Sequence, residues 1–284
     1  MNIRAYYAAL KPERTYANVM TTAAGFLFTS HWHGRWGLMA WTLLGTTLIV
    51  MSACAANNCT DRGIDAQMPR TRKRATVTGA VPVRNLAILG AIFGTVGFIV
   101  LLRYVNVLTS VLGAIAYIDY VVLYAWSKRR TPWSTLIGTI SGAIPLMAGY
   151  TAATGQLNAT ALLLGSVMVA WQMVHFYAIA IFRRDDYAAA NLPVWAVRYG
   201  TRNTQAWMLG YTVLYLASII GLWLAGSTGW LFAAIIVPLG IYWLYLGAKG
   251  FGSVRRDKWA RGMFAFSLIT LLILSATITI SPLL

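Results

Sequence analysis

Long apolar runs separated by short polar segments dominate the chain. Nine runs approach the roughly 20 residues that an α-helix needs to cross a bilayer: 15–33, 38–58, 85–103, 107–126, 134–153, 158–182, 204–225, 229–248 and 262–282. They contain Gly and Ser, as packed transmembrane helices do, and no alternation of period two indicates a membrane barrel. The pattern predicts an all-α protein with nine transmembrane helices, which we expect to form one domain over residues 1–284.

The composition supports the membrane assignment. Of the 284 residues, 58% are hydrophobic and only 11% are charged, whereas a soluble domain carries roughly a quarter charged residues. The mean hydropathy is +0.63. A surface exposed to water could hardly be built from this composition, so we expect an integral membrane protein.

The net charge of +16 is explained by topology. With the N-terminus inside, the inner segments 4–14, 62–84, 128–130, 183–202 and 249–261 hold 21 of the 23 Lys and Arg residues. This segregation follows the positive-inside rule. It predicts a cytoplasmic N-terminus and an outer C-terminus, and with nine spans it excludes a nucleic-acid-binding protein.

Cysteine content and the first residues bear on the compartment. Cys54 and Cys59 are too few for a disulfide scaffold and lack a metal-ligand pattern. Neither a cleavable presequence nor an Arg-rich transit peptide is evident. We therefore expect a bacterial cytoplasmic (inner) membrane.

The acidic residues gather on the expected cytoplasmic side. Only Asp119 lies within a predicted span, and no role for it follows from the sequence. The other six are at inner ends or in inner loops: Glu13, Asp61, Asp65, Asp185, Asp186 and Asp257. Any chemistry is therefore expected at the cytoplasmic face.

The stretch "NNCTDRGID" places Asn57, Asp61 and Asp65 at positions i, i+4 and i+8. If the second span continues as a helix, all three share one face over about 12 Å. Polar groups near a membrane are costly unless they face a cavity or a partner. Amide and carboxylate oxygens suit Mg²⁺, which also takes phosphate oxygens and water. The alternative is a solvated loop that pairs its own Asp and Arg residues.

Two basic segments have two interpretations each. Arg70, Arg72, Lys73 and Arg74 follow the acidic stretch, and Lys128–Arg130 form a second inner loop. Juxtamembrane basic residues commonly set topology and contact lipid headgroups. Beside a carboxylate–metal site, however, guanidinium groups match the oxygens of a diphosphate.

The sixth span carries His175 well inside the run, whereas His31 and His33 lie at the expected outer end of the first run, and Asp185 and Asp186 follow His175 about three turns later. A buried histidine is commonly a hydrogen-bonded packing residue. Ionisable residues within membranes nevertheless tend to be functional, so both interpretations stay open. Trp171, Phe176 and Tyr177 are available nearby to line an apolar cavity.

Several of these motifs resemble those of a known protein family. "NNCTDRGID" resembles the first aspartate-rich motif, Asn-x3-Asp-x3-Asp, of the UbiA-type intramembrane prenyltransferases. The resemblance is specific because further segments from about Lys11 to Pro193 match in order and spacing. They are similar to the branch of that family that farnesylates protoheme IX: "LKPERTYANVMTTAAGF", "DAQMPRTRKR", "KRRTPWSTLIGTISGAIPLMAGY" and "WQMVHFYAIAIFRRDDYAAANLPV".

The resemblance implies a nine-helix bundle around a central cavity, with the aspartate motifs at its cytoplasmic mouth. It implies Asn57, Asp61 and Asp65 as holders of Mg²⁺ on farnesyl diphosphate, with Asp61, Asp65 and Asp186 as catalytic residues. His175 would contact the haem. The implied contacts to diphosphate are Lys11, Arg70, Arg74 and Lys128. Asn58 and Phe182 depart from the family pattern, which has acids at both positions in many members.

The reaction implied is transfer of a farnesyl group from farnesyl diphosphate to a vinyl group of protoheme IX. Water adds in the same conversion, giving haem O and diphosphate. Both substrates partition into the lipid bilayer, and a haem A synthase or a terminal oxidase assembly is the implied recipient of the product.

Two alternatives stay open. A UbiA-type prenyltransferase with an aromatic or quinone-precursor acceptor would share the first motif. A transporter also uses inward-facing polar residues, although no paired interrupted helices occur in matching halves of this chain.

Overall fold

The computed structural model describes residues 3–30 and 34–281, and the regular elements in these ranges are all helices. In chain order they are α1 (Ile3–Ala9), α2 (Pro12–Ser30), α3 (Trp36–Thr60), α4 (Arg62–Gln67), α5 (Val83–Tyr104), α6 (Val107–Ile118), η1 (Asp119–Tyr124), α7 (Ala125–Ser127), α8 (Ser134–Thr154), α9 (Ala159–Phe182), α10 (Arg184–Ala189), α11 (Trp195–Arg198), α12 (Gly200–Leu224), α13 (Trp230–Lys249), η2 (Gly250–Gly252) and α14 (Arg256–Ile280).

Within the described ranges, eight helical segments are long and apolar enough to cross a membrane: Trp36–Thr60, Val83–Tyr104, Val107–Ser127, Ser134–Thr154, Ala159–Phe182, Gly200–Leu224, Trp230–Gly252 and Arg256–Ile280. Each corresponds to a run predicted from the sequence. The all-helical membrane architecture is thereby confirmed.

The remaining predicted run, 15–33, corresponds to α2, which is not one of the eight segments. Its residues 31–33 lie outside the described ranges. Even so, α2 extends between the two ends of the bundle. At its start Lys11 contacts Asn57 near the end of α3, and just beyond its end Arg35 donates to the Ala153 carbonyl near the end of α8. A ninth crossing stays a prediction.

The separation of α5 from α6 is produced by Asn106. Its side chain accepts from the Thr109 backbone N–H at 2.7 Å and so caps α6. Its amide nitrogen also donates to the Thr151 carbonyl of α8 at 3.0 Å. The short polar gap at 104–106 therefore separates two helices, as the sequence predicts.

The segment from Val107 to Ser127 contains a π-helical stretch, η1, that begins at Asp119. The Asp119 carboxylate is buried, and it accepts from the Ser141 backbone N–H of α8 at 3.1 Å. This contact fixes the position of η1 on α8. Asp119 therefore joins two helices within the bundle.

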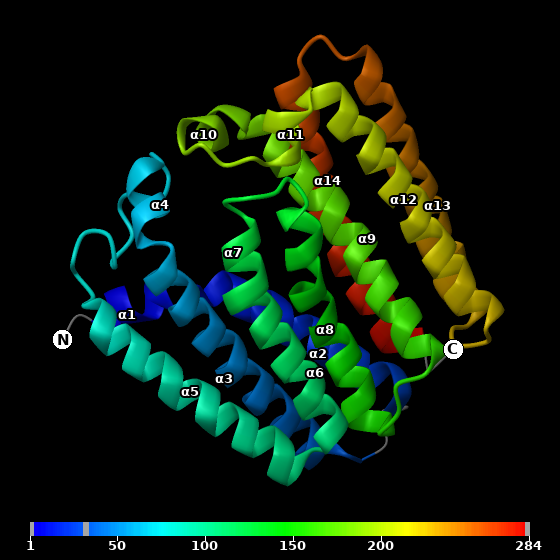
Figure 1. Ribbon diagram of the computed structural model, residues 1–284. Helices are drawn as coiled ribbons and strands as arrows, with labels where there is room; N and C mark the ends of the chain where they lie inside the picture. The colour runs from blue at the N-terminus through cyan, green and yellow to red at the C-terminus, as the bar shows by residue number, and fades with distance from the viewer. Residues whose placement is uncertain (1–2, 31–33, 282–284) are drawn as a thin grey trace.

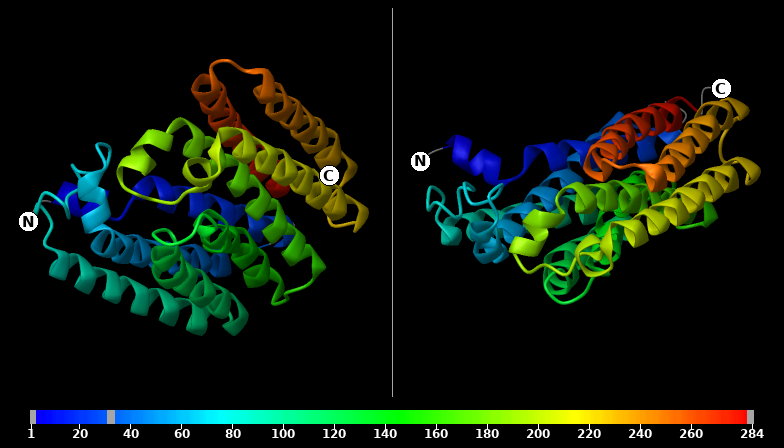
Figure 2. Two further views of the ribbon diagram at one scale, coloured as in Figure 1. Left: turned by 45° about the horizontal axis from the view of Figure 1, so that its top comes forward. Right: turned by 90° about the horizontal axis from the view of Figure 1, so that it is seen from above.

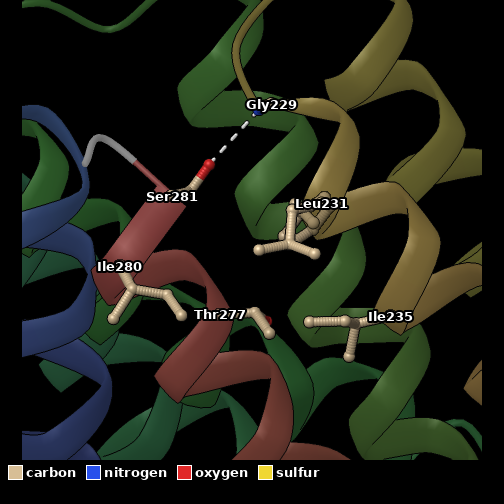
Figure 3. A pocket seen from close by; sticks show the side chains of 7 residues that line it. Gly229, Leu231, Ile235, Thr277, Ile280 and Ser281 are labelled. Atoms are coloured by element: carbon tan, nitrogen blue, oxygen red, sulfur yellow. Dashed lines mark hydrogen bonds between the residues drawn. The ribbon is translucent and has the colours of Figure 1, made fainter. Parts of the chain in front are cut away.

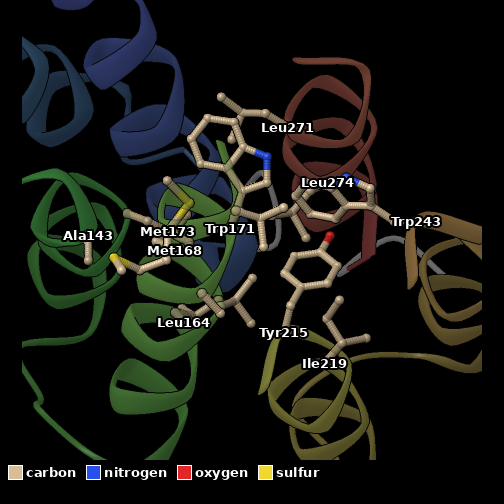
Figure 4. Packing of buried hydrophobic residues seen from close by; sticks show 14 of the residues in the cluster. Ala143, Leu164, Met168, Trp171, Met173, Tyr215, Ile219, Trp243, Leu271 and Leu274 are labelled. Atoms are coloured by element: carbon tan, nitrogen blue, oxygen red, sulfur yellow. The ribbon is translucent and has the colours of Figure 1, made fainter. Parts of the chain in front are cut away.

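The bundle is built around α2, α8 and α9. In this bundle α2 packs against α8, α3 against α5, and α9 against α8, α12 and α14. Figure 1 shows α5 and α13 on opposite flanks, an arrangement also visible in Figure 2. The main core contains Trp171 of α9, Tyr215 of α12, Trp243 of α13 and Leu271 of α14, which Figure 4 shows converging from four helices.

The short helices gather at one end of the bundle. Figure 1 shows α4, α10 and α11 at the end where α1 also lies. The opposite end of the bundle includes the loop between α12 and α13, where Gly229 contacts Ser281 after α14. These short helices therefore lie at the same end of the bundle as the aspartate motifs.

Candidate active site

Asn57, Asp61 and Asp65 lie on a helical path that continues past the end of α3. The Asp61 backbone N–H donates to the Asn57 carbonyl, and the Asp65 N–H donates to the Asp61 carbonyl, both at 2.9 Å. This i to i+4 spacing carries the helical ladder from α3 into α4. The three side chains therefore share one face, and those of Asn57 and Asp65 are buried.

A hydrogen-bonded chain connects Lys11, Asn57, Asp61 and Lys128. The Lys11 ammonium donates to Asn57 Oδ1, and Asn57 Nδ2 donates to Asp61 Oδ2 at 2.9 Å. The Lys128 ammonium forms an ion pair with Asp61 Oδ1. Residues far apart in the sequence thus place two cations and two oxygen-bearing side chains together.

Burial alters both lysines. It lowers the pKa of Lys11 to about 7, with the nearby Arg14 guanidinium acting in the same direction. It also lowers the pKa of Lys128, although the Asp61 carboxylate opposes that shift. Lys11 has a φ of 52° in the turn between α1 and α2, a conformation uncommon outside glycine. That turn directs its side chain toward Asn57.

Asp65 has a separate partner. Its Oδ2 accepts from the Arg74 guanidinium at 2.6 Å, and its backbone carbonyl accepts from the Thr71 hydroxyl at 2.9 Å. The Asp65 side chain thereby holds the basic segment that follows α4. Of the basic residues predicted in this segment, Arg74 is in the site, whereas Arg70 is exposed.

A tyrosine pair forms another side of the site. The Arg14 guanidinium donates to the Tyr120 hydroxyl at 2.7 Å, and the Tyr120 and Tyr124 rings stack at 5.7 Å. The Lys128 ammonium lies 5.6 Å from the Tyr124 ring centroid. Arg14 and both tyrosines were not predicted as site residues from the sequence. The signal for the tyrosines was the spacing of Tyr120, Tyr124 and Lys128 at i, i+4 and i+8.

The second acidic motif reaches the same end of the bundle. Asp186 pairs with Arg183 at 3.3 Å, whereas Asp185 is exposed. Tyr187 lies within electrostatic range of Arg70 and Asp186, and burial raises the pKa of its hydroxyl. The Tyr187 ring belongs to an apolar cluster that joins α4 to the segment after α10: Ile64, Met68, Tyr187, Ala190, Leu192 and Val194.

An open pocket of about 290 Å³ lies beside this contact, and its lining includes Gly63, Ile64, Gln67 and Arg129. At 100° per residue, Gly63 and Gln67 lie on the opposite side of this helix from Asp61 and Asp65. A second pocket lies between the start of α13 and the end of α14 (Figure 3). Its lining is mainly aliphatic, and it is at the other end of the bundle.

His175 does not join the aspartate cluster. Its Nδ1 lies 2.7 Å from the Ser267 hydroxyl of α14, and its ring stacks on Trp171 at 5.0 Å. Ser267 could not be predicted from the sequence, because no motif marks α14. Of the other aromatic residues expected near His175, Phe176 is exposed, and Tyr177 is buried against Trp195 and Tyr211.

The model of the "UbiA prenyltransferase family" matches residues 18–269. The chain belongs to the UbiA prenyltransferase family. Its relatives include "Protoheme IX farnesyltransferase 1" of Shewanella frigidimarina (strain NCIMB 400), which is 41% identical over 283 residues, covering 98% of this chain and 92% of the relative. The resemblance seen in the sequence is confirmed.

Solved structures share this fold. A structure described for digeranylgeranylglyceryl phosphate synthase has a TM-score of 0.83 at 14% identity, covering 99% of this chain and 98% of that one. A UbiA homologue from Archaeoglobus fulgidus bound to GPP and Mg²⁺ has a TM-score of 0.68 at 13% identity, covering 96% and 99%. At these identities the likeness shows the fold.

Two departures from the UbiA family pattern have local physical reasons. The Asn58 side chain donates to the Ala9 carbonyl of α1, which a carboxylate could not do. The Phe182 ring packs against Phe264 at 5.7 Å and lies 5.0 Å from the Arg261 guanidinium. Both positions therefore contribute to packing between elements.

Proposed function

We propose that this UbiA-family protein transfers the farnesyl group of farnesyl diphosphate to a vinyl group of protoheme IX. Addition of water completes the conversion to haem O, and diphosphate is released. The chain of contacts from Lys11 through Asn57 and Asp61 to Lys128 carries the proposal. It brings together oxygen ligands for a metal ion and ammonium groups that can bind a diphosphate. The identity of 41% with a protoheme IX farnesyltransferase supports this acceptor.

The donor set suits Mg²⁺. Asn57, Asp61 and Asp65 offer hard oxygen ligands, and the oxygens of Asn57 and Asp61 already accept from ammonium groups. Among the described residues no group of three or more His, Cys, Asp and Glu side chains could hold a metal ion. Asp61 and Asp65 provide two carboxylates, and Mg²⁺ takes one or two carboxylates and completes its shell with water and phosphate oxygens.

Departure of diphosphate requires compensation of the charge that develops on its oxygens. Lys11, Arg74 and Lys128 lie beside the oxygen ligands and supply cationic donors for those oxygens. Arg70 and Asp186 lie near Tyr187, at the same end of the bundle. Mg²⁺, when bound, would supply Lewis-acid stabilisation of the leaving group.

Breaking the allylic C–O bond leaves a delocalised farnesyl cation that water would trap quickly. The aromatic rings of Tyr120 and Tyr124 lie next to Arg14 and Lys128, where they can shield and stabilise that cation. The vinyl π-electrons of protoheme IX then form the new C–C bond. Water adds to the resulting carbocation beside the porphyrin and loses a proton, which gives the hydroxyethylfarnesyl group.

We infer a location in the bacterial inner membrane, with the site at the cytoplasmic face. The segregation of basic residues supports this orientation. A membrane site suits both substrates, because the C15 chain and the porphyrin partition into lipid. It also places the product where a membrane-bound haem A synthase or terminal oxidase assembly could receive it.

The test is mass spectrometry of haems from a bacterium that lacks its own farnesylating enzyme and expresses this chain. Haem O should accumulate, and Asp61→Ala should lower its formation at least 100-fold, as expected on loss of charge stabilisation at a transition state. Asp185→Ala is the matched control, since Asp185 is exposed and lies outside the cluster. It should retain normal product formation.

Purified protein provides the second part of the test. Removal of Mg²⁺ with a chelator should stop diphosphate release, and added Mg²⁺ should restore it. Near-normal haem O formation by the Asp61→Ala protein would contradict the metal assignment. Prenylation of 4-hydroxybenzoate with no farnesylation of protoheme IX would contradict the acceptor.

A further inference from the structure

The hydrogen bonds of Ser267 determine which atom is the donor in its contact with His175. Ser267 is fully buried on α14, and its hydroxyl makes two short contacts. It donates to the Phe264 carbonyl at 2.6 Å, one turn earlier in its own helix, and it lies 2.7 Å from His175 Nδ1.

A serine hydroxyl has one proton. Because that proton is donated to the Phe264 carbonyl, which can only accept, the contact with His175 requires Nδ1–H to be the donor. A neutral imidazole with a proton on Nδ1 has an unshared electron pair on Nε2. The arrangement around Ser267 thus selects one tautomer of His175.

Aromatic rings cover the remaining sides of the imidazole. Trp171 stacks at 5.0 Å with planes 20° apart, and Phe264 lies at 4.8 Å, tilted by 37°. Phe176 approaches edge-on at 5.3 Å. No hydrogen bond to Nε2 occurs among the described residues, and the His175 side chain is only partly buried. Within that part of the chain, the electron pair on Nε2 is therefore not used by a hydrogen bond.

Ser267 is itself fixed from α9. The Trp171 indole N–H donates to the Ser267 backbone carbonyl at 2.8 Å. One residue of α14 therefore accepts from two residues of α9 that are one turn apart. The orientation of the imidazole is set by two directional contacts as well as by packing.

We propose that Ser267 is a positioning residue that holds His175 in the Nδ1–H tautomer, so that Nε2 ligates the iron of a metalloporphyrin substrate. The identity of that substrate as protoheme IX rests on the proposed function. Iron-ligating histidines usually donate their other N–H to an oxygen acceptor, which orients the ring. Here Ser267 is that acceptor, and the C-terminal helix contributes to substrate recognition.

The experiment is titration of detergent-solubilised protein with ferric haem, followed by absorption and resonance Raman spectra. The wild-type protein should show the signature of imidazole-ligated iron, and His175→Ala should lose it. Ser267→Ala should bind haem roughly 10- to 100-fold more weakly, as found for other residues that orient metal ligands. Ser267→Thr retains the hydroxyl and should restore binding.

Two controls separate coordination from packing. Thr270→Val removes a fully buried hydroxyl from the next turn of α14, where it donates to the Phe266 carbonyl of the same helix. Haem binding should not change in this variant. Metal-free protoporphyrin IX should bind equally to the wild-type and Ser267→Ala proteins, since it has no iron to ligate.

The outcomes separate this inference from the proposed function. Unchanged haem affinity and spectra in Ser267→Ala, or an unchanged spectrum in His175→Ala, would overturn the inference even if haem O is formed. Equal weakening for haem and metal-free porphyrin would also overturn it, because packing would then explain the effect. If Ser267 controls the iron spectrum while no haem O is formed, the inference stands and the proposed function fails.

Discussion

Asp61 and Lys128 are separated by 67 positions in the sequence, yet their side chains form an ion pair between the ends of α3 and α7. Their side chains are only 13% and 10% exposed. The second Asp61 oxygen is held by Asn57. The carboxylate proposed to hold Mg²⁺ is therefore compensated by a cation from the opposite side of the site.

A double-mutant cycle tests this pair. Lys128→Met should lower the free energy of unfolding by about 1–3 kcal/mol, because it leaves a mostly buried carboxylate without its cationic partner. Adding Asp61→Asn should recover part of that loss. Thermal unfolding of the four proteins in detergent measures the coupling. Strictly additive effects would mean that the two side chains do not interact.

Arg74 provides a prediction about local order. Its bond to the buried Asp65 ties the basic segment to α4, so Arg74→Ala should open that segment. We expect trypsin to cleave near Arg70–Lys73 roughly tenfold faster, since cleavage tracks the population of the open form.

Arg72→Ala is the comparison for Arg74→Ala, because Arg72 is exposed. It removes one cleavage site and leaves the Asp65 contact in place. Cleavage at the remaining sites should keep its normal rate. Equal rates in wild-type and Arg74→Ala proteins would show that the Asp65 contact does not hold the segment.

Asp119 is predicted to be structural. Its Oδ2 accepts from the Ser141 N–H, a bond that the amide oxygen of asparagine can also accept. Asp119→Asn should therefore unfold at nearly the wild-type temperature and keep activity. Asp119→Leu should lose about 1–3 kcal/mol, because it leaves that donor without this acceptor. Loss of activity in a stable Asp119→Asn protein would instead indicate a functional role for the carboxyl group.

The sequence predicted the helical spans well because crossing a bilayer imposes a length and a polarity on each run. The break between α5 and α6 at Asn106 could be predicted for the same reason, because a short gap separates two apolar runs that are each long enough to cross the bilayer. The spacing of Asn57, Asp61 and Asp65 placed them on one face on the condition that α3 continues, and a solvated loop was the alternative; the structure shows the helical continuation. These features depend on local periodicity, which a single sequence contains.

Contacts between residues that are far apart in the sequence could not be predicted from it. The pairing of Arg14 with Tyr120 joins residues 106 positions apart, and that of His175 with Ser267 joins residues 92 apart. Neither Tyr120 nor Ser267 is unusual for a transmembrane helix by residue type. The π-helical turn at Asp119 depends on a backbone donor of α8, so only the assembled bundle identifies its role.

The close approach of α2 and α8 provides the last prediction. A Cβ at Gly149 would meet the Thr22 carbonyl oxygen and would lie 2.6 Å from the Phe26 backbone nitrogen. Because backbone atoms cannot move aside as a side chain can, Gly149→Ala should force the helices apart and cost about 1–3 kcal/mol. It should also reduce activity, since α2 begins next to Lys11, whose contact with Asn57 depends on where α2 lies.

Gly210→Ala is the matched control, because Gly210 is exposed on α12 and nothing lies within 4 Å of its added Cβ. Alanine forms helices better than glycine, so this variant should melt at or above the wild-type temperature. Equal melting temperatures for the two variants would contradict the tight contact between α2 and α8.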